Sequence, residues 1–485
     1  MQAQFERGVA MLHSFWYSAA EKTFRDVLAK DPGCAIATWG IASILMSNPL
    51  AGQGASPKSA ESSQAAIEQG RRIGAKTPRE RDYIEAVAAY YQDFGARSER
   101  SRQESRAKAY EALAARYPED DEAQIFSALY LAGTQSQADQ TYAAYLKAAA
   151  ILEKQFIKYP DHPGVAHYLI HSYDAPPIAK QGLPAARRYA SIAPAAPHAL
   201  HMPSHIFTRV GAWEDSATTN LRSAVVAKSN NDLDEQMHAL DYMVYAYLQQ
   251  ARDNDARRAM EEAAQVSGFR AQAGPYAFAA IPARYAVERG AWREAMQLQP
   301  QKTNFPFSDA FTYFARALGA VRSGDATAAE KEAGELARLH KMLQDAKNNY
   351  WATEVEIQRL AVAGWIALVQ GKHDDALKFM RAAADLEDKN EKHIVTPGRV
   401  VPARELLGEM LLELKQPALA LKEFEASQMR EPNRFRGFYG AARAAEAAGD
   451  RQKAREYFAK LVELSKNADT TRPELARAKA YVAQR

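Results

Sequence analysis

Residues 401–434 read VPARELLGEMLLELKQPALALKEFEASQMREPNR, and residues 435–468 read FRGFYGAARAAEAAGDRQKAREYFAKLVELSKNA. In the first segment Gly408 is the eighth residue and Ala420 is the twentieth, and Ala454 is again the twentieth residue of the second segment. Small residues at such fixed spacings let two helices cross closely, because a larger side chain would not fit between them. The 34-residue period therefore predicts antiparallel helix pairs repeated along the chain.

The same register appears at the start of the chain. A unit that begins at residue 1 places Gly8, Ala20 and Phe24 at positions 8, 20 and 24, and Pro32 at position 32. Units that begin at 276, 310 and 357 place Gly at position 15 and Ala at position 20. This is the pattern of the tetratricopeptide repeat (TPR). We predict an all-α fold, a right-handed TPR-type superhelical solenoid of about nine or ten helix pairs that forms one array over residues 1–485.

Three parts of this array are distinguished by their sequence. The segment 162–245 is rich in histidine, 357–468 holds the regular C-terminal repeats, and 472–484 is expected to form a capping helix. Weaker units occupy the stretch from 35 to 160. Longer loops are expected at 47–60, 297–308 and 388–401.

The composition excludes several classes of protein. The chain has 485 residues with 25% charged residues and a net charge of +3, so no strong field points to nucleic acid. No apolar run is long enough to span a bilayer, so we expect a soluble protein that does not span a membrane. The single cysteine, Cys34, rules out an intrachain disulfide. Met1 opens directly into a helix pair, which suggests that an export segment has been trimmed and fits a cytoplasmic or a periplasmic location.

The histidines provide the main candidate site. His167 and His171 fall at positions 5 and 9 of a unit that begins at residue 163, and His201 and His205 fall at the same positions one period later. Positions 2, 5, 9, 12 and 13 line the concave surface of this fold, and imidazoles four residues apart share a helix face. We predict that these four residues bind one transition metal per chain, with Zn, Cu or Fe suited to imidazole ligands. Because neutral imidazole is required, occupancy is expected to fall as the pH drops through about 6 to 7.

Further polar residues fall at concave positions of the same and later units. The candidates for catalysis are Asp174, Asp241 and Tyr245, and the candidates for ligand binding are His198, Arg209, His238 and Arg284. We expect a small-molecule or peptide ligand in the concave groove. The sequence has no phosphate-binding glycine loop and no nucleotide fingerprint, so no nucleotide cofactor is expected.

Several alternatives remain open at this stage. The histidines could form a metal-free polar pocket, or could be similar because the repeats were duplicated. The protein could be a scaffold that binds a peptide, a metal-dependent hydrolase or oxidoreductase, or a metal-binding protein without turnover. Pro203 lies inside an expected helix, where proline is unfavourable, so that helix is expected to begin near Pro203 with His201 in an irregular lead-in.

Several segments resemble a bacterial family of TPR proteins that is distantly similar to tetratricopeptide repeat protein 38. The segments are FERGVAMLHSFWYSAAEKTF, WGIAS, HPGVAHYLIHSYDAPP, HALHMPSHIFTRVGAW, HALDYMVYAYLQ and PARELLGEMLLE. The resemblance extends from the first residues to about residue 480, and its most specific part contains His167, His171, His201 and His205. It implies the TPR fold and no settled activity.

Overall fold

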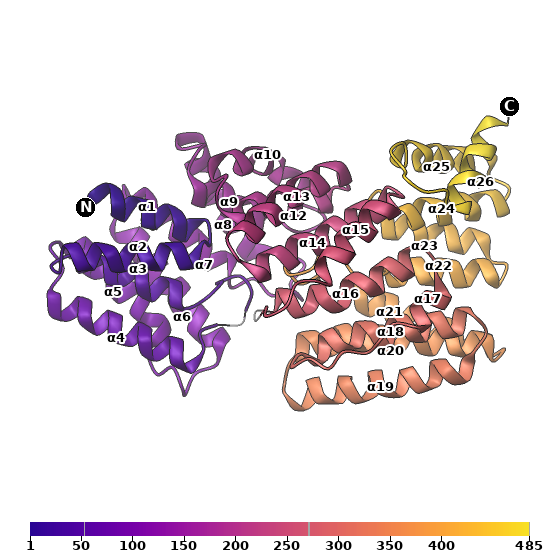
Figure 1. Ribbon diagram of the computed structural model, residues 1–485, viewed down its shortest axis with the longest axis horizontal. Helices are drawn as coiled ribbons and strands as arrows, with labels where there is room; N and C mark the ends of the chain where they lie inside the picture. The colour runs from indigo at the N-terminus through magenta and orange to yellow at the C-terminus, as the bar shows by residue number, and fades with distance from the viewer. Residues whose placement is uncertain (53, 270–271, 485) are drawn as a thin grey trace. The chain divides into compact units, whose positions relative to one another are not determined.

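The computed structural model describes residues 1–52, 54–269 and 272–484, and these residues form helices and no strands (Figure 1). The all-α prediction is therefore confirmed. The chain divides into two compact units, residues 1–206 and 207–485, and each is described by itself. None of the described helices combines the length and the apolar character that crossing a membrane requires.

Among its described residues, the first unit contains ten α-helices and one 3-10 turn before residue 193. Their bounds are α1 (Gln2–His13), α2 (Tyr17–Lys30), α3 (Ile36–Leu45), α4 (Pro57–Ile73), α5 (Pro78–Tyr91), α6 (Glu99–Arg116), α7 (Asp121–Ala132), α8 (Ala143–Lys158), α9 (Pro163–Ser172), the 3-10 turn η1 (Ala179–Gly182) and α10 (Leu183–Ile192). The short helices α11 (Pro197–His201) and α12 (Pro203–Arg209) follow, and the boundary between the units falls within α12.

The second unit continues with longer helices. Their bounds are α13 (Trp213–Ser229), α14 (Leu233–Gln249), α15 (Asp253–Ala263), α16 (Ala273–Glu288), α17 (Trp292–Met296), α18 (Pro306–Arg322), α19 (Ala326–Asp345), α20 (Asn349–Val369), α21 (His373–Asp388), α22 (Ala403–Glu413), α23 (Pro417–Arg430), α24 (Phe435–Ala447), α25 (Arg451–Leu464) and α26 (Pro473–Ala483).

Consecutive helices pack as pairs in both units. Among the described residues, the first unit holds five pairs, from α1 with α2 to α9 with α10, and the second holds six, from α14 with α15 to α24 with α25. These 11 pairs are close to the nine or ten expected. A single superhelix over 1–485 and its handedness stay predictions.

The packing at the crossing positions agrees with the predicted register. A Cβ atom added to Gly8 would lie 2.9 Å from the Phe24 ring, and one added to Gly40 would lie 2.6 Å from it. Phe424 packs in the same way between Gly408 and Gly440, 400 residues later. The phenylalanine at position 24 is thus held between glycines of its own unit and of the next, which explains why small residues recur there.

The irregular parts of the sequence also lie where they were expected. The loops after α3, α17 and α21 match the predicted long loops, and α26 is the predicted capping helix. A helix does begin at Pro203, since proline lacks the N–H that would continue the preceding helix. The expected irregular lead-in is wrong, because His201 is the last residue of the short helix α11.

The inner surface of the second unit is filled by the chain itself. Helices α14, α16, α18, α20, α22 and α24 contact one another in series, and α14 also contacts α24. The segment 389–402 lies against these helices with most of its residues buried. Arg284 of α16 donates to the carbonyl oxygens of Gly398 at 3.1 Å and Arg399 at 2.7 Å, and Tyr276 donates to Thr396 Oγ1 at 2.7 Å. A ligand at this surface would have to displace this segment.

The close contact at Gly408 gives a first prediction. Glycine to alanine in a helix normally stabilises by about 0.5–1 kcal/mol. Gly408→Ala should instead destabilise by about 1–3 kcal/mol, because the new methyl group meets the Phe424 ring, which Gly440 already confines on its other side. Urea unfolding would measure the difference. Gly334→Ala in α19 is the control, since nothing lies within 4 Å of its Cβ position, and equal effects of the two changes would contradict the packing described.

The carboxylates around Arg399 give a prediction about pH. Arg399 donates twice to Glu354, at 2.8 and 3.2 Å, and lies 3.4 Å from Glu387. Burial raises the pKa of Glu387 to about 8, although Arg399 opposes this. Between an unfolded pKa of about 4.3 and a folded pKa near 8, only the folded state holds this proton, so rising pH lowers stability there.

We therefore expect Glu387→Gln to have a higher free energy of unfolding than the unmodified protein at about pH 8. The difference between the two proteins should be smaller at about pH 5. Glu354→Gln is the matched control, because it removes the main partner of a buried arginine and should destabilise at both pH values. Urea unfolding at the two pH values checks this, and a pH-independent effect of Glu387→Gln would contradict it.

Candidate metal centre

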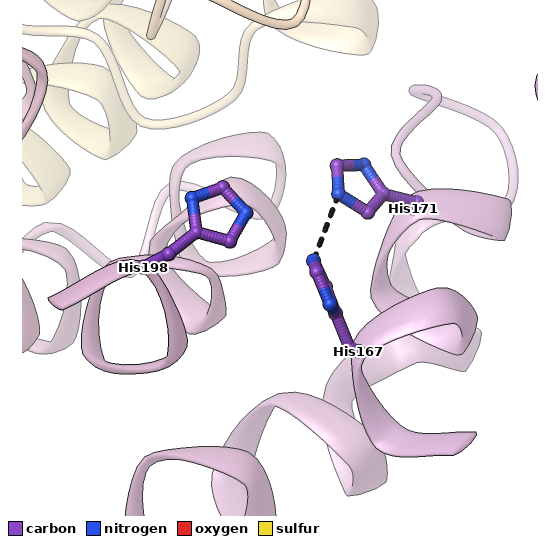
Figure 2. Close-up of side chains that lie close together, drawn as sticks. All are labelled: His167, His171 and His198. Carbon is purple, nitrogen blue, oxygen red and sulfur yellow. Dashed lines mark hydrogen bonds between the residues drawn. The ribbon is translucent and has the colours of Figure 1, made fainter. Parts of the chain in front are cut away.

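Five histidines of the first unit lie together. His167 and His171 come from α9, His198 and His201 from α11, and His205 from α12. Each is buried, with at most 7% of its surface exposed. Figure 2 shows His167 and His171 extending from one helix, with the ring of His198 facing them from another.

The five rings form a closed cycle. The distances between successive ring centroids are 4.9 Å from His167 to His171, 5.7 Å from His171 to His205, 5.0 Å from His205 to His201, 6.1 Å from His201 to His198 and 5.1 Å from His198 to His167. The four histidines at the 34-residue spacing, His167, His171, His201 and His205, are therefore grouped within one unit, as predicted. His198, predicted as a ligand-binding residue, belongs to the same group.

Two pairs of ring nitrogens face each other within this cycle. Nε2 of His171 lies 3.2 Å from Nε2 of His167, and Nε2 of His201 lies 3.0 Å from Nε2 of His205. Two imidazoles that bind one tetrahedral metal with bonds of about 2.0–2.1 Å place their nitrogens about 3.3 Å apart. Both pairs are close to that spacing, and a hydrogen bond between neutral rings would give a similar one.

In one ring of each pair, the other nitrogen, Nδ1, is hydrogen-bonded to a protein oxygen, as is usual for histidines that bind a metal. His167 Nδ1 lies 2.6 Å from the carbonyl oxygen of His13 and donates to it, and His205 Nδ1 lies 2.8 Å from Asp174 Oδ2. These bonds place the proton on Nδ1 and leave the Nε2 lone pair directed at the neighbouring ring. The pKa of His167 lies well below 6.5, mainly because the ring is buried and to a smaller extent because His171 and His198 are near. The ring is therefore neutral.

Aromatic side chains enclose the group. Phe15, in the turn between α1 and α2, has a left-handed backbone with φ of 52°, which is uncommon for a bulky residue. Its ring centroid lies 4.4 Å from that of His167 and 5.4 Å from that of His198, and Tyr189 stacks on His167 at 5.3 Å. These rings exclude water, which strengthens electrostatic interactions inside the site.

A second polar cluster supports the first. Glu122 accepts from His13 Nε2 at 2.8 Å and from His162 Nε2 at 3.1 Å, while the Tyr168 hydroxyl donates to His13 Nδ1 at 2.9 Å. Although burial raises the pKa of Glu122, the two histidines outweigh it and hold the pKa below its usual range. Each of these ring nitrogens has a protein partner, so the cluster is satisfied without a metal. It fixes His13, whose carbonyl oxygen in turn orients His167.

Asp174 is the one catalytic candidate that belongs to the histidine group. Its carboxylate accepts a hydrogen bond from His205 Nδ1. Asp174 therefore contacts the outer nitrogen of this ring and would not contact a bound metal directly. This is the arrangement in which a carboxylate holds the tautomer of a metal-binding histidine.

The other catalytic candidates serve the interior of the second unit. Asp241 pairs with Arg284 at 3.3 Å, and burial raises the pKa of Asp241 to about 6. The Tyr245 hydroxyl donates to Glu431 at 2.9 Å and accepts from Arg434. Both side chains are thus paired with charged residues of the second unit, which explains why polar residues occupy concave positions there.

The remaining ligand-binding candidates also belong to the second unit. Arg209 lies 3.5 Å from Glu391 of the inner segment, so its guanidinium has a partner within the chain. His238 is buried on α14, with its ring edge-on to Tyr242 at 5.2 Å.

The sequence predicted no role for Phe15 or Glu122. His13 carries a usable signal, because position 13 of a unit lines the concave surface. Glu122 carries none, since an acidic residue in the first turn of α7 is explained by the helix dipole alone. Phe15 is set by a turn conformation that repeat spacing does not reveal.

Comparison with known proteins shows no family. No protein-family model matches the chain, and no curated protein matches it. Among solved structures, the Cut9–Hcn1 hetero-tetramer of the APC/C is 13% identical with a TM-score of 0.32, and the match covers 97% of this chain and 95% of that one. The human IFIT1 dimer with m7Gppp-AAAA is 12% identical with a TM-score of 0.34, covering 84% and 87%. Similarities this low carry no argument about function, and the assignment to TPR-type helix pairs stands on the packing described above.

Proposed function

We propose that this protein binds a transition metal at the group of five histidines in its first unit. One observation carries the proposal: two pairs of Nε2 atoms face each other at 3.0 and 3.2 Å, and in each pair one ring is anchored through Nδ1 to a carbonyl or carboxylate oxygen. Such anchoring is the usual outer support of a metal-binding histidine. The polar cluster at Glu122, which needs no metal, lacks this arrangement.

The ligand set favours Zn, Cu or Fe. The group offers imidazole nitrogens, with one carboxylate behind them and no thiolate, and imidazole suits these ions better than it suits Mg or Ca. The metal would compete with protons for the ring nitrogens. Because burial lowers the pKa of His167, we expect metal release to begin only below the ordinary imidazole pKa of about 6.5.

The scaffold alternative has less support in the second unit. The inner surface there is occupied by 389–402, which already satisfies Tyr276 and Arg284. A metal-dependent hydrolase or oxidoreductase would need an open coordination position at the histidine group. We therefore propose metal binding and do not propose a reaction. The alternative function is the binding of a peptide without a metal.

The direct test is the metal content of protein purified without chelator and without a histidine tag. We expect at least one equivalent of Zn, Cu or Fe per chain by elemental analysis. His171→Ala and His205→Ala should each lower the content strongly, because each removes one nitrogen from a facing pair. His373→Ala is the matched control, since this histidine is exposed on α21. Negligible metal, with no uptake of added Zn, Cu or Fe, would contradict the proposal.

The outer support gives a separate prediction. Asp174→Asn keeps the size of the side chain and removes the charge that holds His205 Nδ1–H. Loss of such a partner typically weakens metal affinity by about 10–100-fold. Competition with a chromophoric chelator would measure the affinity. An unchanged affinity in a folded Asp174→Asn protein would contradict a role for the Asp174 carboxylate in supporting a metal-binding His205.

A further inference from the structure

The five histidines divide into two sets. The ligand nitrogens of His167, His171 and His198 all lie within 4.8 Å of one another, and they form the first set. His201 and His205, whose Nε2 atoms are 3.0 Å apart, form the second set. Among the described residues, no group this compact joins nitrogens of the first set to nitrogens of the second.

The ring spacings support the same division. Two imidazoles on one tetrahedral metal, with bonds of about 2.0–2.1 Å, have ring centroids about 5 Å apart. The measured spacings within the sets are 4.9 and 5.1 Å in the first and 5.0 Å in the second. The spacings between the sets are longer, 5.7 Å from His171 to His205 and 6.1 Å from His198 to His201. Four rings gathered around one ion would not show this difference.

We infer that the group binds two transition-metal ions side by side, one at each set, and this rests on the metal binding proposed above. His167, His171 and His198 supply three ligands to the first ion, a number that leaves one position of a tetrahedral shell open. His201 and His205 supply two ligands to the second ion, with Asp174 supporting His205. The single four-histidine ion predicted from the repeat spacing is replaced by two ions in this account.

The arrangement suits a particular class of ligand. Adjacent ions with open positions bind a ligand that carries two oxygen atoms, such as a carboxylate or a phosphate group, by placing one oxygen on each ion. The aromatic rings of Phe15 and Tyr189 make the surroundings apolar, so an anionic group would be bound mainly by the ions. Two-metal sites of this kind act on phosphate or carbonyl oxygens.

The test counts ions in the full-length protein. Metal-free protein is loaded with Zn, excess metal is removed by gel filtration, and elemental analysis gives the ratio of zinc to protein. We expect two ions per chain in the unmodified protein. His198→Ala and His201→Ala should each retain one ion, because each disrupts one set, and the double variant should retain none. Circular dichroism checks that the variants keep their helices.

A second measurement needs no variant. The unmodified protein loaded with Cu(II) should show the half-field electron paramagnetic resonance signal of two coupled ions a few ångströms apart. One zinc per chain, lost equally in His198→Ala and His201→Ala, together with an uncoupled Cu(II) signal, would overturn the two-ion inference and leave the proposed metal binding intact. No zinc or copper in the unmodified protein would overturn both.

Discussion

Helices cross closely at fixed small residues near both ends of this chain, and these crossings determine how successive helix pairs pack. Phe24 and Phe424 each fit between two glycines, and any added methyl group at those glycines would meet the ring. This packing fixes the 34-residue register, and the register decides which side chains face inward. The histidines are brought together as a consequence, since pairs at positions 5 and 9 of successive units must lie on neighbouring helices.

The two units use their inner-facing polar residues differently. In the first unit, buried imidazoles face one another and are anchored from behind by His13 and Asp174. In the second unit, Arg284 and Tyr276 bind the chain's own 389–402 segment. The same concave positions thus hold a candidate ligand site in one unit and an internal support in the other, so position in the repeat does not by itself indicate function.

The sequence predicted those features of the structure that depend on the spacing between residues. It predicted the helix pairs, the long loops, the capping helix and the grouping of His167, His171, His201 and His205. It placed His198 at a concave position but assigned it to ligand binding, because this residue lacks a histidine four residues away, the spacing that distinguished the other four. It also could not distinguish Asp174, which supports a histidine, from Asp241, which pairs with a buried arginine, since both are acidic residues at concave positions.

X-ray absorption at the metal edge, on tag-free protein in solution, would show whether imidazole nitrogens hold the metal. We expect a first shell of nitrogen at about 2.0–2.1 Å and the outer-shell scattering that imidazole rings produce. That scattering should weaken in His205→Ala and stay unchanged in His373→Ala. A first shell of oxygen without imidazole scattering would contradict the claim that the histidine group holds the metal.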